Sequence, residues 1–399
     1  MTQAVDAVAP VRSSHWRVVG AVSAAHFVSH FYILLLAPLI PFVRETYGVS
    51  YTEIGIAFAA FNVVSAALQT PAGFLVDRLG ARTLLIAGLL LGALAFAVVG
   101  LVDSFPVLVA MFGLAGVANT VYHPADYALL SRHVPAQRIG QAFSVHTFAG
   151  MLGSAVAPAS MLTMQSLWGW RGAFLGAAVV GLFVALFLIA MHDRTAAVPA
   201  RKTAESGRSD WHVLLSAPIV LNLFFFVLLA MLSGGIYNYS VVAFGALYGT
   251  PVSIANAALT GNLLLTAIGV LVGGVLASHT RRHGAVAACG LAAATAFMLL
   301  LAEVDLPTAA LIAAMSLAGF FSGIIMPSRD MIVREVTPPG SFGKVFGFVT
   351  TGFNIGGIVA PLVFGAIMDH GSPRLVFLVV AGCTLVAIAT VASRPRRRV

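Results

Sequence analysis

Two ionisable residues of opposite charge stand at equivalent places in two apolar stretches of the sequence. When the second half of the sequence is aligned with the first half at one constant offset, Asp126 aligns with Arg329. A charged side chain inside a hydrophobic segment costs roughly 2.5–3.5 kcal/mol on insertion scales, so its presence indicates a function. Arg329 would then bind an anionic ligand or pair with Asp126, and protonation of Asp126 would break that pair. A permanent structural ion pair is the alternative.

Histidines share helix faces with one another or with Asp126. His26 and His30 lie four residues apart, and His123 precedes Asp126 by three, so each pair would lie on one helix face. Imidazole titrates near pH 6.5 and can exchange protons at physiological pH. For each of them, and for His146, a hydrogen bond to a carbonyl or a neighbouring helix is the alternative. Two histidines four apart can ligate a metal, but no cysteine or close acid completes a set, so no metal site is predicted.

Two further acids have local interpretations. Asp330 lies four residues before Arg334, a spacing that predicts a salt bridge on one helix face, with a second carboxylate in a polar pathway as the alternative. Glu53 stands where an apolar segment begins. An acid there is expected to cap the helix or to be solvated, and a role in proton entry or gating is the alternative.

Uncharged polar side chains inside the apolar segments form a second group of candidates. They supply hydrogen bonds without the cost of a charge, and bonding between helices is the alternative for each. The group comprises Asn62, Gln69, Asn119, Tyr122, Asn222, Tyr237, Asn238, Tyr239, Asn262 and Asn354.

The composition requires that these residues lie in a membrane. Of 399 residues, 59% are hydrophobic and 9% are charged, against about 45–50% and about 25% in soluble domains. A soluble enzyme is therefore excluded. The net charge of +8 does not indicate a nucleic-acid partner, because the charged residues lie between the apolar runs.

The cysteines and the N-terminal segment indicate no disulfide framework and no signal peptide. Cys289 and Cys383 lie inside apolar runs, and their spacing matches no disulfide or metal-binding pattern. The first apolar run is long enough to be a membrane helix instead of a signal peptide.

About 20 apolar residues cross a bilayer as a helix, and the sequence contains twelve such segments. They lack the alternation of barrel strands, so the expected fold is all-α and polytopic. The predicted segments are 16–43, 51–76, 81–102, 105–131, 138–163, 168–191, 214–246, 252–277, 284–302, 307–334, 340–368 and 373–393.

The chain divides into two repeated halves. A polar linker over 192–211 separates a six-helix bundle over 1–191 from a second one over 212–399. The shift that relates Asp126 to Arg329 also aligns further residues without a gap, and a slightly smaller shift lays Tyr47 and Gly48 onto Tyr248 and Gly249. The aligned positions are Pro124, Pro135, Gly140, Phe143, Thr147, Gly153, Ala157, Pro158, Arg171 and Phe174 with Pro327, Pro338, Gly343, Phe346, Thr350, Gly356, Ala360, Pro361, Arg374 and Phe377.

The basic residues predict the orientation. With the N-terminus inside, most of the 22 Lys and Arg residues fall in cytoplasmic loops, while Arg44, Arg171 and Arg374 fall outside and Arg329 lies within a helix. The positive-inside rule therefore places both termini in the cytoplasm and the chain in the inner (plasma) membrane as a multi-pass protein.

The segment GFLVDRLGAR, at the predicted cytoplasmic turn between helices two and three, resembles a signature of the major facilitator superfamily. Gly73, Asp77, Arg78, Gly80 and Arg82 match, and Ala81 replaces a basic residue. The resemblance covers the whole chain and implies two pseudo-symmetric bundles that rock about a central substrate site. It also implies a gating role for this loop, whose acid engages a helix end of the opposite half. In the second-half copy, Ser278 stands where the acid should be.

A second motif lies on helix five. Gly150, Gly153 and Pro158 resemble a motif of the superfamily's antiporters, although Ala157 replaces its last glycine. Together with YHPAD from Tyr122 to Asp126, this run is similar to the fosmidomycin-resistance group of drug exporters. The arginine motif that many proton-coupled members carry on helix four is absent.

These features predict a secondary active transporter of a small organic molecule that works by alternating access and is driven by the proton gradient. Proton antiport that exports a drug or metabolite is favoured by the helix-five and YHPAD resemblances. Symport or exchange of a carboxylate or other organic anion, anchored on Arg329, is the alternative. A membrane-embedded enzyme or a sensor is a remote one, because no nucleophile or signalling domain is evident. We expect no cofactor, no nucleic-acid partner, and a monomer in the lipid bilayer.

Overall fold

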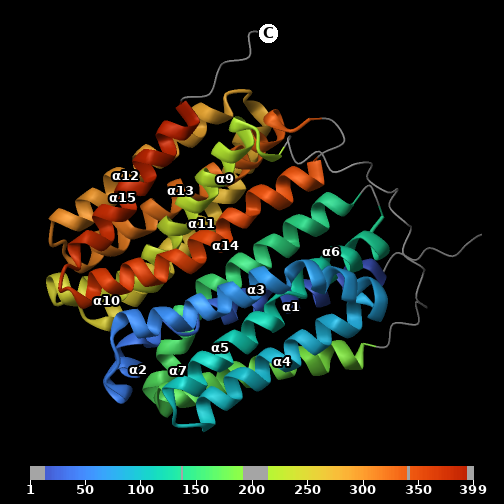
Figure 1. The fold of residues 1–399 in the computed structure, drawn as a ribbon, viewed down its shortest axis with the longest axis horizontal. Coiled ribbons are helices and arrows are strands. Elements are labelled where there is room, and N and C mark those ends of the chain that lie inside the picture. The colour runs from blue at the N-terminus through green and yellow to red at the C-terminus, as the bar shows by residue number, and fades with distance from the viewer. Residues whose placement is uncertain (1–13, 136–137, 192–213, 339–341, 393–399) are drawn as a thin grey trace, which may run out of the picture.

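The computed structural model describes residues 14–135, 138–191, 214–338 and 342–392. Every regular element within these ranges is a helix, as the sequence predicts. Figure 1 shows helices α1 to α7, coloured blue to green, as one bundle and helices α9 to α15, coloured yellow to red, as a second. The predicted linker over 192–211 lies outside the described residues.

The N-terminal bundle contains five long apolar helical stretches, of which the last is a double crossing. Its α7 bends back at Gly169, whose φ of 72° no other residue type adopts readily. The elements are α1 (Ser14–Ile33), η1 (Ala37–Leu39), α2 (Ile40–Tyr47), α3 (Tyr51–Leu79), α4 (Ala81–Leu101), α5 (Phe105–Asn119), α6 (Tyr122–His133) and α7 (Ile139–Ala190).

The C-terminal bundle repeats this plan. Gly48 after α2 and Gly249 after α10, which the repeat aligns, both adopt left-handed geometry with φ of 65° and 66°. The elements are α9 (Ala217–Gly234), η2 (Gly235–Tyr239), α10 (Ser240–Tyr248), α11 (Val252–His279), α12 (His283–Glu303), α13 (Thr308–Val336), α14 (Phe342–Asp369) and α15 (Arg374–Ala392).

The number of membrane crossings agrees with the sequence. Eleven helical stretches of the described chain are long and apolar enough to span a bilayer, and the break at Gly169 divides the longest into two. The predicted segment over 105–131 is interrupted at Thr120, where α5 ends before α6 begins. The polar run IYNYS falls on η2, a single turn of π-helix within the seventh crossing, except for its last residue, Ser240, which begins α10.

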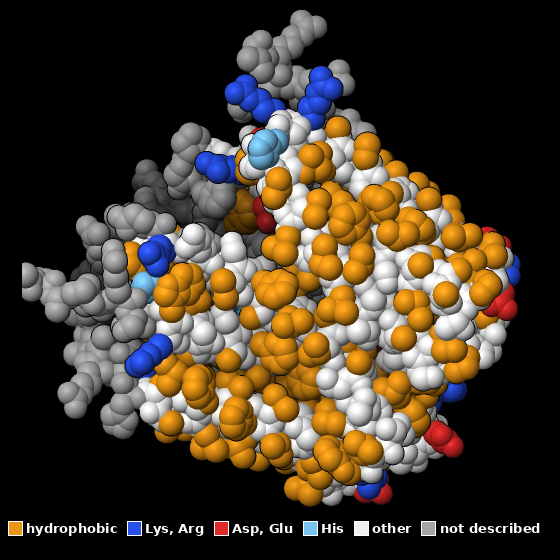
Figure 2. Space-filling view, turned by 180° about the vertical axis from the view of Figure 1, so that it is seen from behind, with side chains coloured by type: hydrophobic (Ala, Val, Ile, Leu, Met, Phe, Trp, Pro, Cys, Tyr) orange, Lys and Arg blue, Asp and Glu red, His pale blue; other side chains and the backbone are white. Residues whose placement is uncertain are grey.

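Apolar side chains cover the outside of the bundles. Phe183, Val179 and Leu186 on α7 are 70%, 63% and 53% exposed, and Figure 2 shows orange side chains spread over the body of the molecule. Such a surface suits lipid and would be unfavourable in water. The chain is therefore a multi-pass membrane protein.

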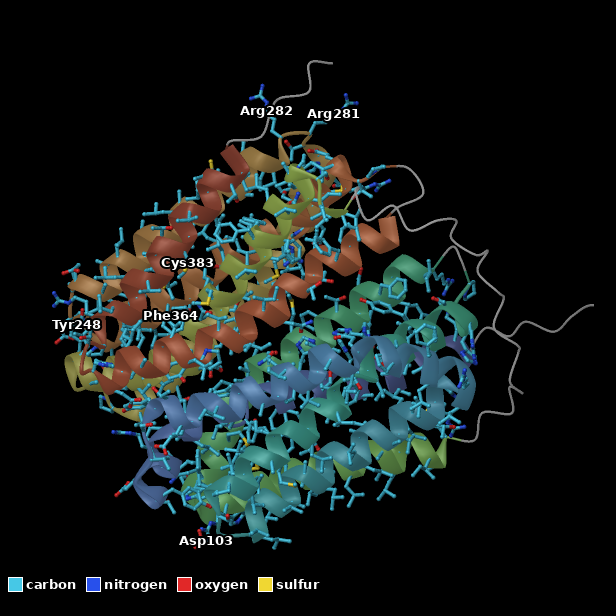
Figure 3. All side chains as sticks on the ribbon, in the orientation of Figure 1. Asp103, Tyr248, Arg281, Arg282, Phe364 and Cys383 are labelled. Atoms are coloured by element: carbon cyan, nitrogen blue, oxygen red, sulfur yellow. The ribbon has the colours of Figure 1, made fainter. Side chains whose placement is uncertain are left out.

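Charged side chains gather at the two ends of the bundles. Figure 2 shows Lys and Arg concentrated at one end, around a hollow between the bundles, and mixed acidic and basic side chains at the other. In Figure 3, Arg281 and Arg282 lie at the opposite end of the C-terminal bundle from Tyr248. We refer to the end that holds Gly48, Gly169 and Gly249 as the predicted outer end.

Candidate functional site

A cluster of histidines around one carboxylate lies inside the N-terminal bundle. His26 comes from α1, His123 and Asp126 from α6, and His146 from α7. His26 Nδ1 lies 3.3 Å from Asp126 Oδ2, and His146 Nε2 lies 3.8 Å from the same oxygen. Three helices that are separate in the sequence thus bring their polar groups to one point.

The imidazole rings of this cluster pack directly on one another. The rings of His26 and His146 stack with centroids 3.8 Å apart. His30 and His123 approach His26 edge-on, at 4.6 Å and 5.1 Å. His30 Nδ1 lies within hydrogen-bonding distance of Ser154 Oγ, at 3.3 Å, so the fourth histidine is held by α7 at the edge of the cluster.

Most polar atoms of the cluster are buried without a hydrogen bond. Asp126 is 0% exposed, His146 1% and His26 4%. A buried polar group without a partner costs about 1–3 kcal/mol, so a concentration of them at one point requires an explanation. The unpartnered atoms include His26 Nδ1, Tyr122 Oη, His123 Nδ1, both carboxylate oxygens of Asp126 and both ring nitrogens of His146.

The glycines of the helix-five motif make room for this cluster. A Cβ atom at Gly150 would lie 2.6 Å from Cδ2 of His26 and 3.0 Å from Cδ2 of His30. A Cβ atom at Gly153 would lie 2.1 Å from the carbonyl oxygen of Phe27. These residues therefore let α7 approach α1 closely, while Pro158 lies further along within α7.

Arg329 lies on α13 in the C-terminal bundle and does not pair with Asp126. Its Nε and Nη2 atoms each lie 2.9 Å from Oδ1 of Asp330. The guanidinium also lies over the rings of Phe226 and Phe353, 4.8 Å and 5.3 Å from their centroids. The side chain of Arg329 is 14% exposed and that of Asp330 is 47% exposed.

Neither ion pair considered from the sequence is present in this structure: the pair with Asp126 is one of two sequence-based alternatives for Arg329, and the salt bridge with Arg334 is the one predicted for Asp330. Asp126 points into its own bundle between α1 and α7, so its carboxylate does not reach Arg329. The predicted pair of Asp330 with Arg334 is replaced by the pair with Arg329, because the two aromatic rings hold the Arg329 guanidinium beside its neighbour's carboxylate.

Tyr127 lies at the edge of the histidine cluster. This residue of α6 is 48% exposed, and its ring stacks on His123 with centroids 6.1 Å apart. It also meets the rings of Phe143 and His146 on α7. The histidine cluster thus reaches the surface of the N-terminal bundle at Tyr127.

The most extensive contacts between the bundles are those of α3 with α14 and of α7 with α11, and the first pair carries polar contacts at the predicted outer end. Asp369, the last residue of α14, accepts hydrogen bonds from the backbone N–H groups of Tyr51 and Thr52 at 2.7 Å and 2.8 Å. It also accepts one from the Thr52 hydroxyl at 2.6 Å. A carboxylate of one bundle thus caps the first helical turn of the other.

A buried tyrosine completes this outer seal. The hydroxyl of Tyr239 donates to the carbonyl of Pro361 at 2.7 Å and lies 3.4 Å from that of Tyr51. Gly365 and Gly55 bring the backbones together, since a Cβ atom at Gly365 would lie 2.8 Å from Thr52 Cα. Sequence reasoning missed Asp369. The sequence feature that could have indicated this residue is an acidic side chain directly before the turn that follows a predicted membrane segment.

Glu53 and the predicted gating loop have local roles in this conformation. Glu53 forms a capping box with Ser50, as the helix-capping interpretation predicts.

In the predicted gating loop, Gly80 turns the chain between α3 and α4 with φ of 92°. Arg82 donates to the carbonyl of Leu188 at 2.6 Å. Gly73 has open space around it and Arg78 is exposed. The side chain of Asp77 lies outside the described part of the chain.

The uncharged polar candidates divide into several kinds. Asn62 donates to the carbonyl of Phe58 and packs against Gly357 across the interface of the bundles. Asn119 donates to Ser65 within its own bundle, and Tyr237 is half-buried on η2. Asn238 and Asn354 are half-buried.

Comparison with known proteins identifies the family. The family model described as Major Facilitator Superfamily matches residues 22–251 and 223–399. The chain belongs to the Major Facilitator Superfamily. This confirms the resemblance drawn from the sequence and the all-α fold of two bundles. The members of this superfamily are transporters of small molecules and are not enzymes.

Two curated relatives match almost the full length of the chain. A probable sulfoacetate transporter of Cupriavidus necator is 26% identical over 391 residues, 91% of this chain and 89% of that protein. The fosmidomycin resistance protein of Escherichia coli is 25% identical over 384 residues, 94% and 92% of the two chains. The predicted likeness to fosmidomycin-resistance proteins is thereby confirmed.

Solved structures share the fold. A bacterial homologue of the human lysosomal transporter Spinster, in an inward-facing and occupied conformation, superposes with a TM-score of 0.78. It covers 97% of both chains at 13% sequence identity, which shows the fold alone.

Proposed function

We propose that this superfamily member moves a small organic anion across the inner membrane by alternating access, with Arg329 as the group that binds the anion. The observation that carries this proposal is the position of the Arg329 guanidinium, a mostly buried cation on α13 that lies over two aromatic rings and is paired only with the half-exposed Asp330 among the described residues. The guanidinium lies against the rings of Phe226 and Phe353, which contact each other, so it is oriented before any ligand arrives, and a planar guanidinium suits carboxylate, sulfonate or phosphonate oxygens.

A relative of almost equal length supports an anionic substrate. Sulfoacetate, named for the Cupriavidus necator protein, carries a carboxylate and a sulfonate. Asp330 holds Arg329 in the absence of anion and is itself about half exposed. An incoming anion would displace this carboxylate, which then turns to the solvent.

The conformation supports the inward-open state of the transport cycle. Lys and Arg gather at the end opposite to the seal formed by Asp369 and Tyr239. With that basic end and both termini in the cytoplasm, the hollow in Figure 2 opens inward. Release of the Asp369 cap and closure of the basic end would expose Arg329 to the other side.

Export of a drug or metabolite by proton antiport is the second candidate. The likeness to the fosmidomycin resistance protein over 92% of its length favours it. Proton coupling through Asp126 stays a prediction. It fails if Asp126→Asn retains full accumulation driven by a pH gradient in proteoliposomes.

A thermal-stability screen of the purified protein tests the proposed substrate class. Sulfoacetate, simple carboxylates, lipophilic cations and neutral metabolites are each added at saturating concentration. A ligand at 100 times its dissociation constant stabilises the folded state by about 2.7 kcal/mol. We expect anions to raise the melting temperature of the wild type but not of Arg329→Ala. Arg334→Ala, an exposed arginine on the same helix, should respond like the wild type. Stabilisation by lipophilic cations alone would favour the drug exporter instead.

A further inference from the structure

The histidine cluster brings several potential metal ligands together. Ligand atoms of His26, His123 and His146 all lie within 4.8 Å of one another, and Asp126 Oδ2 lies 3.3 Å from His26 Nδ1 and 3.8 Å from His146 Nε2. When a metal ion binds nitrogen and oxygen ligands at about 2.0–2.1 Å in a tetrahedron, neighbouring ligand atoms are about 3.3–3.4 Å apart. The rings of His26 and His146, which stack with centroids 3.8 Å apart, would have to turn relative to each other for both to bind one ion.

The same atoms are poorly explained by hydrogen bonding. N–H···O bonds have lengths of about 2.7–3.2 Å and a nearly linear geometry. His26 Nδ1, His146 Nε2 and Asp126 Oδ2 make no hydrogen bond, although the carboxylate oxygen lies 3.3 Å and 3.8 Å from the two nitrogens. Buried ligand atoms that lie this close without sharing a proton are available to bind a metal ion.

The donor set selects a class of ion. Three imidazoles and one carboxylate, with no thiol, suit Zn²⁺ and its neighbours Co²⁺, Ni²⁺ and Cu²⁺, whereas Mg²⁺ and Ca²⁺ prefer shells of oxygen ligands. A divalent ion would also compensate the charge of Asp126, which is 0% exposed and has no Lys or Arg partner among the described residues.

We propose that His26, His123, His146 and Asp126 form a binding site for a divalent transition-metal ion of the Zn²⁺ class. The ion would link α1, α6 and α7 inside the N-terminal bundle. Sequence reasoning predicted no metal because no acid stood beside His26 and His30. The fold supplies that acid from α6. This inference does not depend on the proposed anion transport, which rests on Arg329.

The remaining polar groups around the site would act as its outer shell. His30 stands beside His26 and is held by Ser154. Tyr122 and Tyr127 are the hydroxyl-bearing neighbours of Asp126. Tyr127, half exposed, and the partly exposed His123 lie at the boundary of the cluster, which gives an ion a short path from the space between the bundles.

Metal titration of the full-length protein tests the proposal. The protein carries a tag without histidine, is purified in detergent and is stripped with EDTA. ZnCl₂ is then titrated by calorimetry, and CoCl₂ is followed by the visible absorption of tetrahedral Co²⁺. We expect one ion per chain and a tetrahedral Co²⁺ spectrum. His146→Gln should weaken Zn²⁺ binding by about 100-fold or more, because even an outer-shell partner contributes 10–100-fold.

Two controls separate this site from adventitious binding and from the anion site. His279 and His370 are exposed histidines bonded to backbone carbonyls, so the double variant His279→Gln/His370→Gln should bind Zn²⁺ like the wild type. Arg329→Ala should also retain Zn²⁺ binding. If anion binding fails in the thermal screen while Zn²⁺ binds, only the proposed function is overturned.

Three results would overturn the metal site. These are no Zn²⁺ binding by the wild type, binding that His146→Gln leaves unchanged, or binding that the surface double variant removes. Because His146→Gln could disturb folding, its circular dichroism and elution volume are compared with those of the wild type, and His123→Gln provides a second variant at the partly exposed edge. Loss of pH-driven transport in Asp126→Asn without metal binding by the wild type would instead assign the cluster to proton exchange.

Discussion

Asp126 and Arg329 occupy equivalent positions of the two repeated bundles, but their surroundings differ. Asp126 is fully buried among histidines of its own bundle, and no arginine or lysine in the described part of the chain pairs with it. Arg329 is partly exposed, is paired with the adjacent Asp330 and lies against the rings of two phenylalanines. The same backbone plan therefore supports a closed polar centre in one half and an accessible binding group in the other.

This difference teaches that internal symmetry of the helices does not carry over to their chemistry. At the surface of the predicted outer end the symmetry persists. Arg171 pairs with Asp103 in the first bundle and Arg374 pairs with Glu303 in the second. The two halves diverge where the polar groups are buried.

Adding one methyl group beside the histidine cluster should have the largest effect. Gly150→Ala places a Cβ atom 2.6 Å from the His26 ring, and overpacking of this kind costs about 1–3 kcal/mol. We expect a lower melting temperature and weaker Zn²⁺ binding, with the anion response unchanged. Gly20→Ala on α1 is the matched control, since its Cβ would meet nothing within 4 Å. A loss of the anion response as well would show that the two regions are coupled.

Much of this comparison could be predicted from the sequence. The lengths of the apolar segments predicted the membrane crossings, and the internal repeat predicted that Asp126 and Arg329 occupy equivalent positions. The direction in which a side chain points could not be predicted, because it depends on how α1 and α7 pack around α6. For the same reason the pairing of Asp330, the role of His146 beside Asp126 and the cap by Asp369 needed the structure.

The outer seal allows a test of whether the bundles move as predicted. Asp369→Asn removes the charge that the amides of Tyr51 and Thr52 stabilise. Hydrogen bonds to charged groups contribute about 1.5–3 kcal/mol when buried, and we expect about 1–2 kcal/mol at this exposed site. The outward-open population should rise by roughly 5–30-fold.

This shift can be measured as faster thiol labelling of Asn62→Cys in a background without Cys289 and Cys383. Asn62 packs against Gly357 across the interface, so a thiol there reports opening. Glu53→Gln is the control, because Glu53 caps only its own helix. Equal labelling rates in Asp369→Asn and Glu53→Gln would contradict the seal.

A conservative substitution tests whether the planar shape of the Arg329 side chain, and not its charge alone, matters for anion binding. Arg329→Lys retains the charge but loses the planar stacking on Phe226 and Phe353, which contributes about 0.5–2 kcal/mol. We expect the affinity for the stabilising anion to fall by roughly 10-fold, measured by the concentration dependence of the melting temperature. Arg334→Lys should leave it unaltered. An unchanged affinity in Arg329→Lys would mean that the rings do not orient the guanidinium for the anion.

The paired charges at the outer surface should show the smallest effects, and the same effect in both bundles. Exposed ion pairs contribute about 0.2–1 kcal/mol, and both Arg171 and Arg374 are substantially exposed. Double-mutant cycles on Arg171 with Asp103 and on Arg374 with Glu303 should therefore give small and similar coupling energies. A large difference between them would extend the asymmetry of the bundles to the surface.

The close glycine contacts of the outer seal offer a way to hold the protein in a single state. At Gly55 an added Cβ would lie 2.6 Å from the carbonyl oxygen of Pro361, and at Gly365 it would lie 2.8 Å from Thr52 Cα. A side chain at either position acts as a wedge between the bundles, while each bundle keeps its own packing. Gly365→Val would thus provide a trapped sample of the opposite conformer, suited to cryo-electron microscopy and to raising conformation-specific binders.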